Sequence, residues 1–272
     1  MSKLAAILLL AGTALAVGAT AMAAEPARRS CADGAAGASQ TSLTPAEKAE
    51  GWRLLWDGST SAGWRAVKSD VFPEKGWQMC GGVLSVQGKD GEESQGGGDI
   101  ITTRRYAEFE LSAEFKTTPG ANSGIKIFTQ PTLSAIDKVT GKPAQIGSAI
   151  GLEFQVLDDE RHPDAKLGRD GNRTIGSLYD LIPAAKDKTV MPVGQWNQAR
   201  IVSKGKLVSF WLNGKKTVEF ERGSPAFRAS VAASKFKEIP LFGEWPDGHI
   251  LLQDHGNDVS FRNIKIRDLG GK

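Results

Sequence analysis

The chain of 272 residues lacks the motifs on which several large enzyme classes depend. It has no glycine-rich phosphate loop before a helix and no C-x-x-C or H-E-x-x-H motif, so nothing supports a nucleotide-binding enzyme or a zinc protease. No G-x-S-x-G stands on a strand-to-helix turn, which excludes the common serine hydrolase arrangement. The formal net charge is only +3 and no basic block occurs. We therefore expect no nucleic-acid partner.

Cysteine and histidine are also scarce. The two cysteines, Cys31 and Cys80, could pair in an oxidising compartment, but a pair in which one member lies in a polar tail leaves the question open. The histidines number three: His162, His249 and His255. Because histidine titrates near neutral pH, each of the three is a candidate for a functional role.

The N-terminus predicts export. Lys3 precedes an apolar run from Leu4 to Val17, and Ala21-Met22-Ala23 has the small-x-small pattern of a signal peptidase site. The run is shorter than the ~20 residues of a membrane span, although a retained anchor is the alternative. We predict a signal peptide at residues 1–23, a flexible linker at 24–41 and one folded domain at 42–270. The expected location is periplasmic or secreted, with no membrane partner.

The periodicity of the remaining chain predicts an all-β fold. Thr44-Pro45-Ala46-Glu47 is a capping box with proline at the first helical position and predicts one short helix that ends at Gly51. Beyond it, apolar and polar residues mostly alternate, and glycine-rich turns separate short runs. The expected strands lie at 108–115, around 125–127, and at 150–156, 198–203, 207–212, 216–221, 249–253 and 259–267. This pattern predicts an antiparallel β-sandwich with a short N-terminal helix.

The stretch from Ala149 to Pro183 concentrates ionisable residues beside one strand. Ile150, Leu152, Phe154 and Val156 form its apolar face, and the opposite face carries Glu153 and Gln155 next to Gly151. A solvated outer face is the ordinary explanation for Glu153 and Gln155, but the glycine leaves room for a ligand. An ordinary glycosidase needs two carboxylates ~5–9 Å apart. Here Glu153 has no acidic partner of the same parity on its strand, which disfavours that mechanism.

Two histidines stand where they could take part in chemistry. His162 follows Asp158-Asp159-Glu160 in the loop after the strand, where it is either a general base or a surface histidine bonded to a neighbouring acid. His255 shares strand parity with Gln253 at a turn, where it could equally satisfy backbone carbonyls.

Several motifs between Leu43 and Leu269 resemble those of the bacterial 3-keto-disaccharide hydrolase domain and follow one another in the same order as in that family. This family is also described as 3-keto-glucoside 1,2-lyase and 3-keto-2-hydroxy-glucal hydratase. The residues that carry the resemblance are Gly51-Trp52, Leu55-Trp56-Asp57-Gly58, Gly63-Trp64, Asn122-Ser123-Gly124-Ile125, Gly151-x-Glu153-x-Gln155-x-x-Asp158, Gly176-x-x-Tyr179, Gly194-x-Trp196-Asn197, Leu212-Asn213-Gly214, Ile250-x-x-Gln253-x-His255 and Phe261-Arg262-Asn263-Ile264.

The resemblance implies a concanavalin-like jelly roll and a substrate already oxidised at C3 by a separate sugar 3-dehydrogenase. The C3 ketone acidifies the C2 proton, so a base forms an enolate, the C1 aglycone leaves by β-elimination, and water adds back. On this basis His162 is the expected base, with Tyr179 or His255 as the acid for the aglycone. Lys166 or Arg173 would stabilise the enolate.

The remaining candidates are sugar-binding and metal-binding groups. Glu153 and Gln155 would hold sugar hydroxyls, together with Asn122 and Gln253. Glu153, Asp158 and His162 could instead hold a divalent metal ion that polarises the ketone. The alternative function is a carbohydrate-binding module that binds sugar without cleaving it.

Overall fold

The computed structural model describes residues 41–270 except 90, 94–95 and 134–147. The predicted signal peptide, almost all of the predicted linker and Cys31, one member of the possible Cys31–Cys80 pair, lie outside these residues. In the part of the chain that the model describes, no helix is long and apolar enough to span a membrane.

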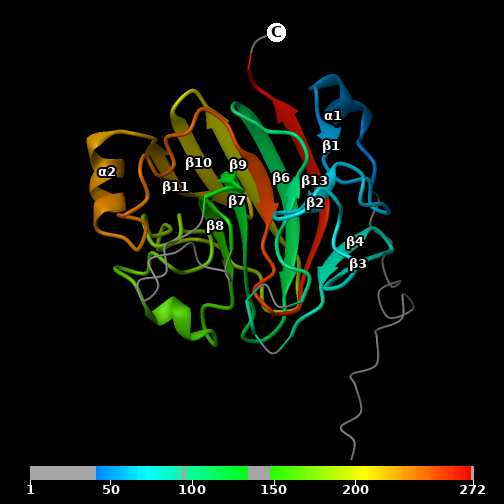
Figure 1. The fold of residues 1–272 in the computed structure, drawn as a ribbon, viewed down its shortest axis with the longest axis horizontal. Helices are drawn as coiled ribbons and strands as arrows, with labels where there is room; N and C mark the ends of the chain where they lie inside the picture. Colours follow the sequence, from blue (N-terminus) through cyan, green and yellow to red (C-terminus); the bar gives the residue numbers. More distant parts are fainter. Residues whose placement is uncertain (1–40, 90, 94–95, 134–147, 271–272) are drawn as a thin grey trace, which may run out of the picture.

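Two antiparallel sheets form the molecule (Figure 1). The larger, sheet A, has the order β11-β10-β9-β6-β13-β4-β3, with β1 also paired to β13; the smaller, sheet B, has the order β2-β5-β12-β7-β8. The strands are β1 (Arg53–Leu54), β2 (Trp64–Ala66), β3 (Trp77–Cys80), β4 (Val83–Val86), β5 (Ile100–Thr102), β6 (Phe109–Thr117), β7 (Asn122–Gln130), β8 (Ile150–Leu157), β9 (Asn197–Lys204), β10 (Leu207–Leu212), β11 (Lys215–Glu221), β12 (His249–Leu252) and β13 (Val259–Asp268). The predicted antiparallel sandwich is confirmed. The predicted strands from 108 onward all occur: β7 extends three residues beyond the expected 125–127 at each end, and the others end within two residues of their expected ends.

Helices are few, and their ends follow local capping rules. The predicted helix is α1 (Pro45–Ala49), and both hydrogen bonds of the Thr44–Glu47 capping box are present. The sequence analysis did not predict α2 (Pro225–Ala232), which begins at the N-cap Ser224 with proline at its first position. Phe227 of α2 stacks on Phe220 of β11 with ring centroids 5.5 Å apart, which fixes α2 beside that end of sheet A (Figure 1).

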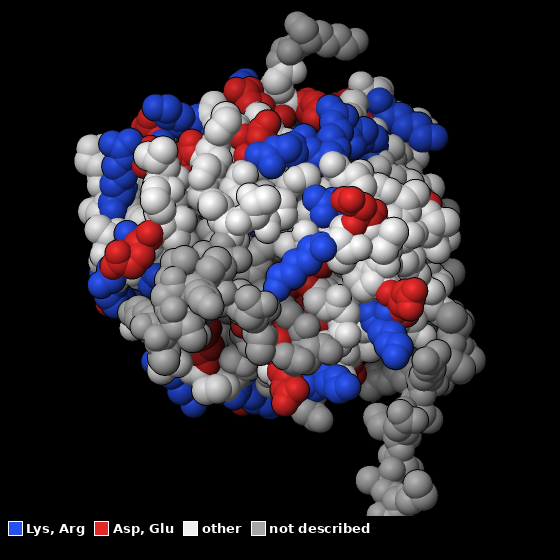
Figure 2. Space-filling model, viewed as in Figure 1, with Lys and Arg blue, Asp and Glu red and all other residues white. Residues whose placement is uncertain are grey.

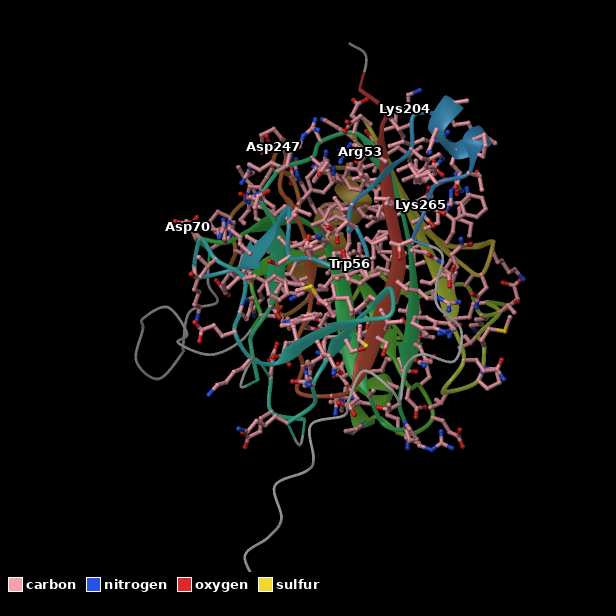
Figure 3. All side chains as sticks on the ribbon, turned by 90° about the vertical axis from the view of Figure 1, so that its right-hand side faces the viewer. Arg53, Trp56, Asp70, Lys204, Asp247 and Lys265 are labelled. Atoms are coloured by element: carbon pink, nitrogen blue, oxygen red, sulfur yellow. The ribbon has the colours of Figure 1, made fainter. Side chains whose placement is uncertain are left out.

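Aromatic side chains from both sheets fill the core. The ring of Phe154 of β8 meets that of Phe115 of β6 edge-on, with centroids 6.2 Å apart, and lies tilted against that of Phe210 of β10, with centroids 5.4 Å apart. Trp56 is almost wholly buried and lies in the middle of the molecule in Figure 3, whereas Asp70, Asp247 and Lys204 lie at its periphery. Since Phe154 faces sheet A, its neighbours Glu153 and Gln155 face away from sheet A.

The polar face of β6 is covered. A strand that alternates apolar and polar residues commonly exposes its polar face, yet Glu110 and Ser112 are both buried. Glu110 lies between Arg200 of β9 and Arg267 of β13, and these long side chains cover the strand while their charges pair with the carboxylate. On the face shown in Figure 2, acidic and basic side chains are intermixed, most densely near α1.

Candidate functional site

Three neighbouring strands of sheet B carry a row of polar residues on the face that points away from sheet A. Gln155 of β8 pairs with Gly124 of β7, and the Gly124 carbonyl accepts a hydrogen bond of 3.0 Å from the backbone of Gln253, just after β12. A Cβ at position 124 would lie 2.8 Å from Cδ of Glu153 and still closer to Oε1. The Glu153 carboxylate therefore occupies the space above Gly124 that a side chain would otherwise fill.

Glu153 is a buried carboxylate with one ionic partner. It pairs with Lys126 of β7, whose Nζ lies 3.5 Å from Oε2, and only 7% of each side chain is exposed. Among the described residues, no hydrogen-bond donor lies on the Glu153 carboxylate apart from this ion pair. Burial of a charge is costly unless its acceptor positions are used, so the carboxylate is in an environment suited to an incoming donor. The ordinary explanation, a solvated outer face, is excluded by this burial.

The two glutamines of the row present unused acceptors. Gln155 Nε2 donates to Asn122 Oδ1 at 3.3 Å, and Gln253 Nε2 donates to Glu93 Oε1 at 3.4 Å. The Oε1 atoms of both glutamines are buried and have no hydrogen-bond partner. Native structures rarely leave such atoms unpaired, so the pair indicates a site where ligand or water donors bind.

A returning segment of the β8–β9 loop forms the side of the site. Tyr179 N donates to the Glu153 carbonyl at 3.0 Å, which aligns residues 176–179 along β8 and places Tyr179 next to Glu153. The Tyr179 hydroxyl donates to Asp164 Oδ2 at 2.8 Å, and Arg173 bridges Asp164 and Asp180 at 2.7 Å each. Burial, together with the charges of Glu153 and Asp164, raises the pKa of Tyr179. Tyr179 is therefore a neutral phenol whose proton is hydrogen-bonded to Asp164, and Arg173 stabilises the loop through its two ion pairs.

His162 lies near His255 but in an orientation that opposes its expected role. It caps the 3-10 helix η2 (Pro163–Lys166), because its Nδ1 accepts a hydrogen bond of 3.2 Å from Asp164 N. Burial and the charge of His255 lower the pKa of His162, which favours the neutral ring. With Nδ1 used as an acceptor, the neutral ring carries its proton on Nε2. A general base needs an unprotonated nitrogen that faces its proton, and in His162 that nitrogen, Nδ1, already accepts from Asp164 N.

His255 lies beside His162. Its ring meets that of His162 edge to face with centroids 6.0 Å apart, and its buried Nδ1 has no partner. His249, by contrast, is bonded through Nδ1 to the Thr102 carbonyl at 2.7 Å and is a structural histidine.

Lys235, after α2, is a functional candidate that the sequence did not reveal. Its Nζ lies 4.3 Å from the centroid of the Tyr179 ring, and its backbone N–H donates to Asp180 Oδ2 at 2.8 Å. Removal of solvent by the surrounding protein lowers its pKa, although the charge of Glu153 acts in the opposite direction. Within the described residues Lys235 forms no ion pair, so its charge is available to a bound anion.

Three predicted site residues take no direct part in this cluster. Asp158 anchors its own loop, since its carboxylate accepts from Gly120 N at 2.8 Å and from Arg161 Nη1 at 3.2 Å. Burial alone would raise the pKa of Asp158, but these hydrogen bonds hold it below its usual range. Lys166 is exposed on η2, away from the buried row, and Arg173 is already bound by two carboxylates.

The predicted metal-binding set does not assemble. In the described part of the chain, no three or more histidine, cysteine, aspartate or glutamate side chains form a group that could hold a metal ion. Asp158 uses its carboxylate on its own loop, and His162 uses Nδ1 on a backbone N–H. The donor set of Glu153, Asp158 and His162 therefore does not fit a divalent ion, and we derive no chemistry from one.

Comparisons with known proteins identify the family of this chain. The family model of the 3-keto-alpha-glucoside-1,2-lyase-like domain matches residues 51–267. A protein of Bacteroides thetaiotaomicron named 3-keto-disaccharide hydrolase is 37% identical over 233 residues, which are 81% of this chain and 79% of that protein.

Solved structures give the same picture of the fold. Two crystal structures from Parabacteroides distasonis, each named as a candidate glycosyl hydrolase, are both 29% identical to this chain. The first has a TM-score of 0.68 and covers 85% of this chain and 99% of its own. The second has a TM-score of 0.58 and covers 80% and 99%. From the match over residues 51–267 and the 37% identity to the Bacteroides protein, this chain belongs to the 3-keto-alpha-glucoside-1,2-lyase-like domain family.

Proposed function

We propose that this protein cleaves 3-keto-glycosides by removal of the C2 proton, β-elimination of the C1 aglycone and addition of water. Its family and the name of its Bacteroides relative indicate a glycoside-cleaving enzyme that acts on 3-keto-disaccharides. The elimination mechanism goes beyond this family-level activity and is supported by the chemistry of the polar row.

The observation that carries the mechanism is the single buried carboxylate of Glu153. A ketone at C3 makes the C2–H bond acidic, so one well-placed base is sufficient and no second carboxylate is needed across the glycosidic bond. Glu153 has no hydrogen-bond donor among the described residues besides Lys126. Its oxygens are therefore open to a substrate proton, and we assign Glu153 the role of base in place of His162.

Two other groups supply the charge and the proton that the reaction needs. As the C2–H bond breaks, its electron pair forms the C2–C3 double bond and negative charge moves to the C3 oxygen. Lys235, an unpaired cation beside Tyr179, stabilises that enolate oxygen. His162 Nε2–H donates to the oxygen that leaves C1, since its Nδ1 is already occupied. The resulting enone then takes up water at C1 and a proton at C2, which gives net hydrolysis.

The unpaired oxygens of Gln155 and Gln253 bind sugar hydroxyls. Both amides are fixed through their NH₂ groups, so their oxygens are oriented before the ligand arrives. A carbohydrate-binding module without activity is less well supported, because the row consists of acidic, amide and basic groups and not of stacked aromatic rings.

The proposal extends to the supply of substrate and to location. The 3-keto group requires earlier oxidation of the sugar, so a sugar 3-dehydrogenase is the functional partner.

The basic and apolar N-terminal sequence supports the proposal that the protein is exported to the periplasm or secreted. Fractionation of cells that express the full chain, followed by N-terminal sequencing, tests it; a cytoplasmic protein that retains residues 1–23 would contradict it.

The catalytic proposal is tested with 3-keto-trehalose and a 3-keto-β-glucoside, each beside its unoxidised parent sugar, in D₂O. We expect turnover of the keto sugars only, with deuterium at C2 of the product. Glu153→Gln should lower kcat by at least ~10²-fold, as expected for loss of a general base. Glu219→Gln, an exposed control on β11, should not change it. Binding without turnover would favour a binding module, and turnover without C2 deuterium would refute the elimination.

A further inference from the structure

A buried chain of polar contacts leads from Glu153 to a second carboxylate that lies outside the proposed reaction. Lys126 Nζ lies 3.5 Å from Glu153 Oε2 and also donates to Ser148 Oγ. Ser148 Oγ donates in turn to Oδ2 of Asp99, which lies just before β5. Three residues that are far apart in the sequence, Asp99, Lys126 and Ser148, thus meet next to the proposed base.

Lys126 is held so completely that it has no donor left for substrate. An ammonium group has three N–H donors. In Lys126 they face Ser148 Oγ, the Ala149 carbonyl at 3.1 Å and the Glu153 carboxylate. Because both charged side chains are 7% exposed, the orientation of this ammonium determines where the carboxylate lies.

Asp99 fixes the far end of the chain. It is 5% exposed, and its Oδ2 accepts from Ser148 Oγ and from Ala149 N at 3.2 Å. Its Oδ1 accepts from Asp254 N at 3.0 Å. Asp254 uses its own carboxylate on Gly97 N and Gly98 N, so it supports Asp99 only through its backbone.

We propose that Asp99 is a positioning residue for the reaction, acting through Ser148 and Lys126 on the Glu153 carboxylate. This inference rests on the proposed function, because it assigns Asp99 a role in placing the base. Asp99 does not touch the substrate. With Asp99 ionised, it holds Ser148 Oγ and Ala149 N, and Lys126 is fixed against the Glu153 carboxylate. With Asp99 neutral, these charge-assisted hydrogen bonds weaken, and Lys126 no longer holds Glu153 as firmly in place.

The charges around Asp99 give this coupling a pH range. The groups that face it are Lys126 from β7, Glu93 from the preceding loop, the backbone of Asp254, and Glu153 beyond Lys126. Burial raises the pKa of Asp99 to about 6, while Lys126 and the hydrogen bond from Ser148 act to lower it and Glu93 acts to raise it. Turnover should therefore fall as the pH drops through about 6, where Asp99 takes up its proton.

The test compares Asp99→Asn and Ser148→Ala with Ser203→Ala, which removes a buried hydroxyl that donates to the Ala107 carbonyl in sheet A. Steady-state kinetics on 3-keto-trehalose are measured from pH 4.5 to 8.5. We expect both linked variants to lower kcat by about 10- to 100-fold, the range typical of groups that orient a catalytic residue. KM should stay within a few-fold. Asp99→Asn should also lose the acidic inflection, and Ser203→Ala should behave as wild type.

Each outcome separates the two proposals. If Glu153→Gln abolishes turnover but Ser148→Ala keeps the wild-type kcat and pH profile, the positioning role of Asp99 is refuted and the proposed function stands. If Ser203→Ala loses as much kcat as Ser148→Ala, the effect is general destabilisation and the inference fails. If the wild-type enzyme turns over no 3-keto sugar, the proposed function fails and the inference fails with it. Ser148 is itself half-buried, so Ser148→Ala can decide between these outcomes even if Asp99→Asn does not fold.

Discussion

Gly124→Ala is the sharpest perturbation that the structure offers, because it moves the proposed base without changing any ionisable group. The added Cβ would lie 2.8 Å from Cδ and 2.9 Å from Cγ of Glu153. Carbon atoms in contact normally lie about 3.5–4.0 Å apart, so the Glu153 carboxylate must shift by about 1 Å. The backbone of Gly124 has no positive φ, so alanine causes no strain in the main chain.

The expected loss is in activity more than in stability. A displacement of about 1 Å in a catalytic group can cost about 10²-fold in rate, which corresponds to about 2.7 kcal/mol in the activation free energy. Crowding should lower the free energy of unfolding by about 1–3 kcal/mol. The smaller entropy of the unfolded alanine chain should offset about 0.4–1 kcal/mol of that. Steady-state kinetics on a 3-keto-glucoside and urea unfolding measure the two effects.

A double-mutant cycle with Glu153→Gln decides whether the loss arises from Glu153. If alanine at 124 acts by displacing the carboxylate, the double variant should be no slower than Glu153→Gln alone. The reasoning is refuted if Gly124→Ala keeps the wild-type kcat, or if it slows Glu153→Gln by the same factor as it slows the wild type.

Three further predictions follow from the charges of the site. Lys235→Met should lower kcat by about 10²-fold with little change in Tm, because it removes a cation that no described residue pairs with; an unchanged kcat would remove Lys235 from the mechanism. His162→Ala should slow substrates with poor leaving groups by about 10²-fold and those with good leaving groups much less, since it removes a proton donor; equal losses for both would restore His162 as a base. The pKa of Asp99 is about 6 in the folded protein and 3.8 as its ordinary value, so the folded state holds the proton more tightly than the unfolded state does. The free energy of unfolding therefore falls as the pH rises from about 4 to about 6. Urea unfolding should therefore show the stability of wild type relative to Asp99→Asn fall by about 3 kcal/mol across that range; a constant difference would contradict the raised pKa.

The fold class and the central strand could be predicted from local sequence patterns. Alternation of apolar and polar residues specifies which side of a strand is buried, so β8 and the strands after it were predictable from period-two patterns alone. The Thr44–Glu47 capping box likewise acts within one helical turn, and α1 was predicted from it. Motifs in constant order also gave the family, which the family model and the Bacteroides relative show.

The partners of the site residues depend on tertiary contacts that the sequence does not reveal. Lys126 belongs to an ordinary alternating strand, and its importance arises from the pairing of β7 with β8, which places it opposite Glu153. Lys235 follows a helix that was not predicted, and it reaches the site because Phe227 packs α2 against β11 and Asp180 binds its backbone. His162 has the residue type of a base, but a backbone N–H occupies its Nδ1. Residue types and periodicity specify which side chains are present and which face they share. The protonation state and the partners of each group depend on contacts between segments far apart in the chain, and those contacts exist only in the folded protein.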